Sequence, residues 1–355
     1  MSDFSIPVWP HAYGGPVATG DIKAEPEDFV VEEILSFIPE GSGEHVFLHI
    51  EKIGENTEYV ARLLARHAGV RQRDIGYAGL KDRHGRTRQW FSVWLPTPKQ
   101  ALGPDQQPLP GKPEPDWRAL ENTQLKILQV IRHARKLRRG VLSGNRFEIV
   151  LRNWQGNREV AEQQLRQIQT QGFPNYFGEQ RFGHQGRNVE KALAMFAGDR
   201  VKREQRSIYL SAARSFLFNQ ILAERLYTGT WNCGLAGEVC KLQGSNSQFV
   251  AASIDQTLME RMRQGETHPT GALWGKGICA AGGEVLALEQ RIVSRYPSLA
   301  DGLLKAELEQ DRRALRVIPE DLNWQFEKDS LLLRFGLPAG SYATALLREI
   351  VQTSG

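Results

Sequence analysis

One stretch of the sequence, GYAGLKDRHGRTRQW at Gly76–Trp90, places a single carboxylate among cations after a small, apolar approach. The basic residues around Asp82 in this stretch are Lys81, Arg83, His84, Arg86 and Arg88. A carboxylate flanked by cations is favoured in its ionised form. An ionised aspartate suits nucleophilic attack or proton abstraction, although an aspartate beside a lysine is more often a surface ion pair.

Two further segments have the composition of a surface that binds nucleic acid. RHARKLRRG (132–140) holds five lysines and arginines and no acid: Arg132, Arg135, Lys136, Arg138 and Arg139. NYFGEQRFG (175–183) sets three aromatic residues among glycines. Cations that grip phosphates and aromatic rings that stack on bases are typical of RNA-binding surfaces. The alternatives are a solvated basic face for the first segment and a packed turn for the second.

The elements that must position these residues alternate between strand and helix. The hydrophobic periodicity predicts strands at 29–31, 45–53, 90–95 and 146–153. Helices are predicted between Asn56 and Gly69 and at 158–172, 207–227 and 299–317, and residues 331–351 read as a strand, a glycine turn and a helix. This alternation indicates a fold of the α/β or α+β class.

Composition limits the classes of protein. A chain of 355 residues, 41% of them apolar, is long enough for two domains or for one large domain with an insertion. The net charge of +4 permits a nucleic-acid partner without requiring one. Three cysteines without metal-ligand spacing fit a reducing cytosol and neither a disulfide framework nor a zinc site. We find no membrane-length apolar run and no signal peptide, so we expect a cytoplasmic protein.

Familiar catalytic motifs are absent from the sequence, and one long loop stands out. GALWGKG (271–277) has the wrong spacing for a phosphate loop, and neither GxSxG nor HExxH occurs. Residues 96–115 contain seven prolines and must form a loop. This loop is either a surface excursion or an arm that contacts the substrate.

Six stretches, in order along nearly the whole chain, resemble the TruD family of tRNA pseudouridine synthases. They are IKAEPEDFVVEE (22–33), GYAGLKDRHGRTRQW (76–90), RKLRRGVLSGNRFEIVLR (135–152), NYFGEQRFG (175–183), SAARSFLFNQ (211–220) and LRFGLPAGSYAT (333–344). The resemblance implies an enzyme that isomerises a uridine of tRNA to pseudouridine, at position 13 in the bacterial members. It implies a tRNA partner, no nucleotide or metal cofactor and no membrane, and we expect a monomer.

The resemblance also implies a domain organisation. A pseudouridine-synthase catalytic domain with a mixed, largely antiparallel sheet would occupy residues 1–155 and 315–355. An inserted, family-specific α/β domain would occupy residues 156–314, and the two would form a positively charged cleft. The proline-rich loop 96–115 departs from any pattern of the family that we can place, which leaves the contacts at one rim of that cleft open.

Residue by residue, the family's catalytic aspartate falls on Asp82 of GLKDRHG. Its GNxF strand motif falls on Asn145 and Phe147, its early basic residue on Lys23, and its late-strand aromatic on Phe335. The expected substrate-binding residues are thus Lys23, Lys81, Asn145, Phe147, Phe335, Arg135, Arg138 and Arg139.

The reaction breaks the N1–C1′ bond of uridine, turns the base and rejoins it through C5. The uridine must first leave the RNA fold, at a cost of a few kcal/mol, and stacking on Phe147 would offset roughly 1–3 kcal/mol of it. Asp82 would attack C1′ or C6, or take a proton from C2′, and the sequence does not choose among these. Lys23 would pair with Asp82. The alternatives are a non-catalytic RNA-binding or RNA-chaperone protein on the same scaffold, and a metal-dependent nuclease, which would need clustered carboxylates.

Overall fold

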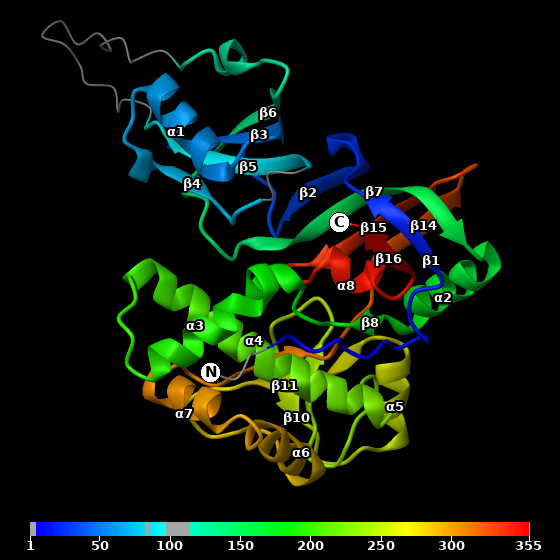
Figure 1. Cartoon of the computed structure of the whole chain (residues 1–355). Helices are drawn as coiled ribbons and strands as arrows, with labels where there is room; N and C mark the ends of the chain where they lie inside the picture. Colours follow the sequence, from blue (N-terminus) through cyan, green and yellow to red (C-terminus); the bar gives the residue numbers. More distant parts are fainter. Residues whose placement is uncertain (1–4, 82–84, 97–113, 355) are drawn as a thin grey trace, which may run out of the picture. The chain divides into compact units, whose positions relative to one another are not determined.

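A computed structural model of the chain describes residues 5–81, 85–96 and 114–354, and all structural statements refer to these residues. The chain forms two compact units, each built from separate stretches of sequence (Figure 1). The first, here called the sheet unit, comprises Gly20–Gln155, Glu320–Gly340 and Thr353–Gly355. The second, here called the helical unit, comprises Met1–Thr19, Gly156–Pro319 and Ser341–Gln352.

A mixed sheet forms the centre of the sheet unit, with the strand order β14-β15-β7-β2-β5-β3-β6. Its strands are β2 (Phe29–Leu35), β3 (His45–Ile53), β5 (Arg86–Trp94), β6 (Leu125–His133), β7 (Leu142–Gly156), β14 (Glu320–Phe326) and β15 (Leu331–Pro338). The pair β2–β5 is parallel, and the other neighbours along this path are antiparallel. Short β4 (Ile75–Tyr77) pairs with β5, while β1 (Ala18–Ile22) pairs with β7 and with β16 (Val351–Ser354).

Helix α1 (Thr57–Ala68) covers one face of this sheet at its β3–β5 end (Figure 1). Local sequence fixes both of its ends, as predicted. The side chain of Asn56 accepts a hydrogen bond from the N–H of Tyr59, and Gly69 ends the helix at φ 62°, a left-handed conformation that glycine adopts without strain. The buried helix residues Val60 and Leu64 pack with strand residues in one core.

In the helical unit, long helix α4 (Arg203–Tyr227) contacts α3, α6, α7 and β11. The other helices are α2 (Arg158–Gln171), α3 (Arg187–Phe196), α5 (Gln256–Arg263), α6 (Gly283–Val293), α7 (Pro297–Lys305) and α8 (Ala343–Leu347). The strands are β8 (Phe173–Pro174), β9 (Val239–Leu242), β10 (Gln248–Val250), β11 (Thr267–Leu273), β12 (Asp311–Ala314) and β13 (Arg316–Val317). The predicted helices at 158–172 and 207–227 are confirmed as α2 and α4.

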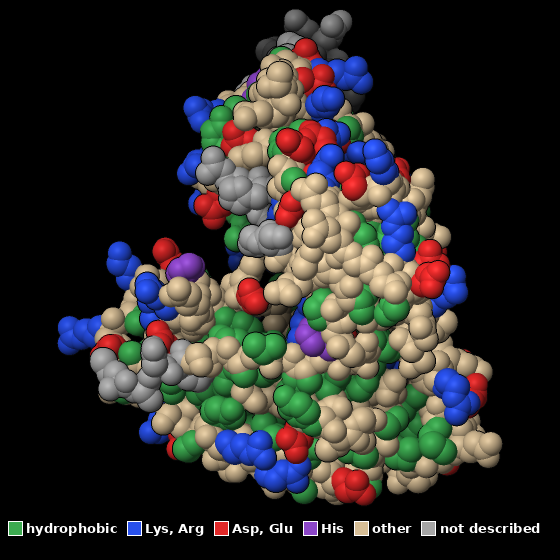
Figure 2. Space-filling model, turned by 45° about the vertical axis from the view of Figure 1, so that its right-hand side comes forward, with side chains coloured by type: hydrophobic (Ala, Val, Ile, Leu, Met, Phe, Trp, Pro, Cys, Tyr) green, Lys and Arg blue, Asp and Glu red, His purple; other side chains and the backbone are tan. Residues whose placement is uncertain are grey.

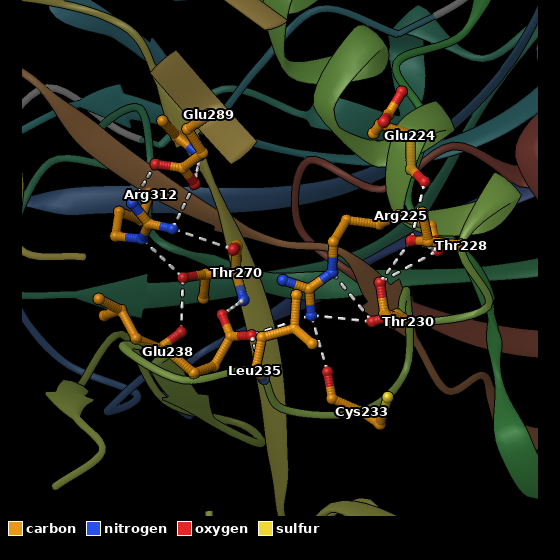
Figure 3. A network of polar contacts seen from close by, with 12 residues as sticks. Glu224, Arg225, Thr228, Thr230, Cys233, Leu235, Glu238, Thr270, Glu289 and Arg312 are labelled. Carbon is orange, nitrogen blue, oxygen red and sulfur yellow. Dashed lines mark hydrogen bonds and ion pairs between the residues drawn. The ribbon is translucent and has the colours of Figure 1, made fainter. Parts of the chain in front are cut away.

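Two buried ion pairs tie these elements together (Figure 3). Arg225 of α4 lies 2.9 Å from Glu238, and Arg312 of β12 lies 2.6 Å from Glu289 of α6. Thr270 of β11 joins the two pairs, because its hydroxyl accepts from Arg312 and its N–H donates to Glu238. A buried charge is tolerated only when it is paired and hydrogen-bonded, and each of these is.

The helix predicted at 299–317 is wrong over its second half. Helix α7 ends at Lys305, Glu307 has a positive φ of 57°, and the chain then runs as β12 and β13. The arginines of DRRALR belong to strands: both Arg312 and Arg316 are buried, Arg312 is paired with Glu289, and Arg316 donates to the carbonyl of Met262. In the described part of the chain, no helix has the length and apolar character to cross a membrane.

Candidate active site

The register of the sheet places three of the expected site residues on one face. In the antiparallel pairing of β7 with β15, Phe147 lies opposite Phe335. Asn145 precedes Phe147 by two positions, so its side chain points to the same face. A Cβ on Gly144, the first residue of the GNxF motif, would collide with the carbonyl of Leu337, so the motif needs glycine there for β7 and β15 to approach.

Strand β2 adds a carboxylate to this face that the expected residues did not include. Its pairing with β7 sets Glu33 opposite Asn145 and Val31 opposite Phe147. The carboxylate of Glu33 is buried and accepts the backbone N–H of Trp90 at 2.9 Å. Burial raises the pKa of the Glu33 carboxyl above its usual range, although Lys81, the Trp90 N–H and Lys52 act in the opposite direction.

Lys81, the residue before Asp82, is turned into the protein. Its amine donates to Asn145 Oδ1 at 2.6 Å and lies 3.1 Å from Glu33 Oε1, as an ion pair. Its backbone N–H donates to the hydroxyl of Thr57, the first residue of α1, at 3.0 Å. The side chain is only 11% exposed. We expected Lys81 to bind substrate, but its amine already interacts with Asn145 and Glu33 inside the protein.

Asp82 lies outside the described residues, together with Arg83 and His84, so its predicted role stays a prediction. Its neighbours on either side are described. Lys81 is held as above, and Gly85 approaches the backbone of β2 so closely that a Cβ would lie 2.7 Å from the carbonyl oxygen of Phe29. Lys81 is thus held at the sheet face that carries Asn145, and Gly85 lies against the backbone of β2.

An aromatic row continues the site on this face. The ring of Phe147 stacks on Phe335, with ring centroids 5.3 Å apart, and meets the edge of Phe29 at 6.3 Å. The amine of Lys23 lies 4.5 Å from the centre of the Phe29 ring, within range of a cation–π contact. Lys23 also has a φ of 60°, a left-handed backbone that a lysine rarely adopts and that is common at functional positions.

The basic run divides into anchored and free cations. Arg132 pairs with Glu114 at 2.8 Å and donates to two backbone carbonyls, and Lys136 donates to the carbonyl of Arg73. Arg135, Arg138 and Arg139 are exposed and have no partner among the described residues. Of the run, only these three can bind phosphate without first breaking an interaction within the protein.

The other segments that the sequence singled out give less support for an RNA-binding surface. The rings of Tyr176, Phe177 and Phe182 in NYFGEQRFG are buried, which supports the alternative of a packed turn. On the face seen in Figure 2, lysines and arginines lie interspersed with acids and do not form one basic patch. The proline-rich loop falls almost entirely outside the described residues. Within the described ranges no three His, Cys, Asp or Glu residues group closely enough to hold a metal ion.

Sequence reasoning missed three residues that hold the site: Glu33, Thr57 and Gln89. Thr57 donates to Gln89 Oε1 at 2.9 Å, and Gln89 Nε2 donates to the carbonyl of Gly79 at 2.8 Å. A signal was present for Glu33, since it is in phase with the buried residues Phe29 and Val31 of the same strand. A carboxylate on the apolar face of a strand must find a partner inside the fold.

Comparison with known proteins agrees with this arrangement. The family model described as tRNA pseudouridine synthase D (TruD) matches residues 10–199 and 184–350. The chain belongs to this family. Its members isomerise uridine in tRNA to pseudouridine, so the expected family, enzyme class and function are confirmed.

Relatives extend the match over nearly the whole chain. A tRNA pseudouridine synthase D from Methylococcus capsulatus is 47% identical over 97% of this chain and 94% of its own length. One from Nitrosococcus oceani is 48% identical over 96% of this chain and 94% of its own. These are enzyme names and give no support to a non-catalytic RNA-binding protein.

A solved structure supports the fold. The crystal structure assigned to tRNA pseudouridine synthase D from Methanosarcina mazei superposes with a TM-score of 0.66 at 20% identity, covering 98% of this chain and 95% of that one. With the mixed sheet and the helices described above, it confirms the expected fold class.

Proposed function

We propose that this TruD family member converts uridine 13 of tRNA to pseudouridine, with Asp82 as the catalytic carboxylate. The observation that carries the proposal is the 2.6 Å hydrogen bond from Lys81 to Asn145. It ties the residue next to Asp82 to the GNxF strand, which supports assigning the two motifs that the family likeness singles out to one site. The chemistry needs a carboxylate next to an extruded base, and no cofactor takes part.

The binding roles follow from where the expected residues lie. Arg135, Arg138 and Arg139 hold phosphates, which position the RNA without reading its sequence. Phe147 meets the flipped uracil as one member of the Phe29–Phe147–Phe335 row, since little of its ring is exposed. Lys23, beside Phe29, provides a cation for the charge of Asp82.

The domain assignment belongs to the same proposal. The sheet unit carries the catalytic residues, and residues 156–314 form the inserted family-specific domain that helps to hold the tRNA. We expect the enzyme to act as a cytoplasmic monomer.

The decisive test is the modification itself. Purified protein is incubated with unmodified tRNA transcripts, and pseudouridine is mapped by carbodiimide treatment and primer extension. We expect one modified position, uridine 13, for the wild type and none for Asp82→Asn at saturating enzyme over a long incubation. The amide keeps the shape of the side chain but can neither attack carbon nor take a proton.

Binding by the same variant separates catalysis from structure. Asp82→Asn removes a negative charge from a site that faces RNA, so its tRNA affinity should stay equal or rise slightly at fixed salt. An aspartate that only organised its basic neighbours would weaken binding when replaced. Sustained turnover by Asp82→Asn, after deamidation has been excluded by mass spectrometry, would remove Asp82 from the catalytic role. EDTA in the assay should change nothing, whereas a metal-dependent nuclease would stop.

A further inference from the structure

The segment Gly79–Lys81 is held by the protein at several points immediately before Asp82. The carbonyl of Gly79 accepts from Gln89, and the N–H of Lys81 donates to Thr57. Thr57 and Gln89 are themselves joined by a hydrogen bond, and both are buried. The main chain leading to Asp82 is therefore bound to helix α1 and strand β5 through a fixed pair of side chains.

Glu33 holds the side chain of Lys81, in addition to the contacts that hold its main chain. It belongs to β2, receives the N–H of Trp90 from β5, and lies against the Lys81 amine that also reaches Asn145 of β7. Glu33 and Lys81 together thus connect three neighbouring strands: the Glu33 carboxylate joins β2 to β5, and the Lys81 amine joins Glu33 to Asn145 of β7. The nearby cation Lys52 donates its amine to the carbonyl of Glu55.

Stability alone is a weak reason for this arrangement. Burying an ion pair costs desolvation, and replacing such a pair by apolar residues is often neutral or stabilising. A charged, hydrogen-bonded pair, unlike an apolar pair, defines the direction and the distance between its two partners. The Lys81 amine must lie between Glu33 and Asn145 to contact both, and this restricts where the next residue begins.

We propose that Glu33 is a positioning residue for the reaction: it fixes the Lys81 amine against Asn145 and thereby orients the backbone that carries Asp82. This inference rests on the function proposed above. Glu33 does not contact the substrate. Lys81 holds the backbone in place through its contacts with Glu33 and Asn145 and does not bind phosphate.

The test compares two Glu→Gln variants on the same strand. Glu33→Gln keeps the shape and an acceptor for the Trp90 N–H but leaves Lys81 without its counter-charge. Glu32→Gln is the matched control, because Glu32 is the preceding residue, points to the opposite face and pairs there with Arg88. Single-turnover rate constants at saturating enzyme report the chemical step, and filter binding reports tRNA affinity.

We expect Glu33→Gln to lower the single-turnover rate about 10–100-fold, the scale of a misplaced reacting group. The tRNA dissociation constant should stay within about twofold, since the variant keeps every cation that binds phosphate. Glu32→Gln should leave both quantities near the wild-type values. Rates for Glu33→Gln equal to those of Glu32→Gln would overturn the inference.

A second measurement separates positioning from folding. Thermal unfolding gives the folded fraction of each variant at the assay temperature, and the rate is expressed per folded molecule. If the loss of rate merely follows the loss of folded protein, Glu33 is a structural residue and the inference is overturned. Lys81→Met and the double variant Glu33→Gln/Lys81→Met complete a cycle, and the double variant should be no slower than the slower single one.

The outcome also separates this inference from the proposed function. A wild-type protein that forms no pseudouridine overturns the proposed function, and the inference with it. An active wild type with fully additive effects of Glu33→Gln and Lys81→Met overturns only the inference.

Discussion

The ring of Phe147 lies 5.3 Å from that of Phe335, with 23° between the two ring planes. Strands β7 and β15 set the two residues directly opposite one another. Phe147 is 7% exposed and Phe335 is 1% exposed, so each ring covers the other from solvent. The pair is therefore a part of the core as well as a side of the candidate active site.

This pair predicts coupled effects of substitution on stability. Phe147→Leu and Phe335→Leu should each lower the free energy of unfolding, and their effects should be less than additive by about 0.5–1.5 kcal/mol, the value of an aromatic pair. Urea unfolding of the two single variants and the double variant measures this coupling. Phe147→Tyr keeps the ring and should retain more pseudouridine synthesis than Phe147→Leu. Intact activity per folded molecule in Phe147→Leu would show that Phe147 has a core role only.

The three exposed arginines predict a change in the salt dependence of tRNA binding. Replacing Arg135, Arg138 and Arg139 by alanine should weaken binding and reduce the slope of log K against log salt by up to about 0.7–0.9 for each phosphate that is no longer neutralised. The matched control removes three other exposed cations of the sheet unit, through Arg71→Ala, Arg118→Ala and Lys126→Ala. Equal slopes for the two triple variants would show that the run is an ordinary solvated face.

Buried His268 predicts a loss of stability in mild acid. Its Nε2 lies 2.6 Å from Gln243 Oε1, and its Nδ1 accepts from Arg316, so a second proton would break a hydrogen bond and set two cations together. Burial, helped by Arg316 and Lys241, lowers the pKa of His268 to about 3. Because this pKa is below the ordinary value of about 6.5, the stability that His268 contributes is present above pH 6.5 and is lost as the pH falls toward 3.

Unfolding at a series of pH values tests this sign. The free energy of unfolding of the wild type should fall by a few kcal/mol between pH 6.5 and pH 4, allowing for other groups that titrate there. His268→Gln should be less stable at pH 7.5 but should lose less on acidification. His184→Gln, at an exposed position of the same unit, is the control and should follow the wild type. Parallel curves for wild type and His268→Gln would contradict the prediction.

The buried pair Arg312–Glu289 predicts a large cost when one partner is removed. Glu289→Gln leaves the guanidinium of Arg312 without its counter-charge, and breaking a buried pair in this way costs about 3–5 kcal/mol. Glu260→Gln breaks the exposed pair with Arg263 and should cost less than about 1 kcal/mol. Denaturant unfolding followed by tryptophan fluorescence measures both variants. A similar cost for the two would mean that the buried network is not what holds the helical unit together.

The elements with local signals were predictable from the sequence, and those that depend on distant partners were not. Asn56 and Gly69 mark the ends of α1 through hydrogen bonds within a few residues, so the sequence alone located this helix. Arg312 of β12 and Arg316 of β13 are buried charged residues, and their partners come from other elements. Nothing near them in sequence shows that burial, which is why the predicted helix at 299–317 extended too far.

The residues of the candidate site were likewise only partly predictable from the sequence. The resemblance supplied Asn145, Phe147 and Phe335, and the register of the sheet brings these residues to one face. It suggested an RNA contact for Lys81, whereas the Lys81 amine binds Glu33 and Asn145 inside the protein. The direction of a lysine side chain depends on which strands lie beside it, and a single sequence does not show that.

The pairing of β15 with β7 has a consequence for how the enzyme is made. On the ribosome, β2, β3, β5, β6 and β7 are synthesised before residues 156–319, the largest stretch of the helical unit, and β14 and β15 follow that stretch. Until then the β7 edge that later holds β15 is unpaired, and an open edge is a place where chains associate wrongly. Closing the sheet requires an interaction between distant parts of the chain, which is slow to form. A nascent chain therefore gains Phe335, the last aromatic residue of the candidate site, only after residues 156–319 have been synthesised.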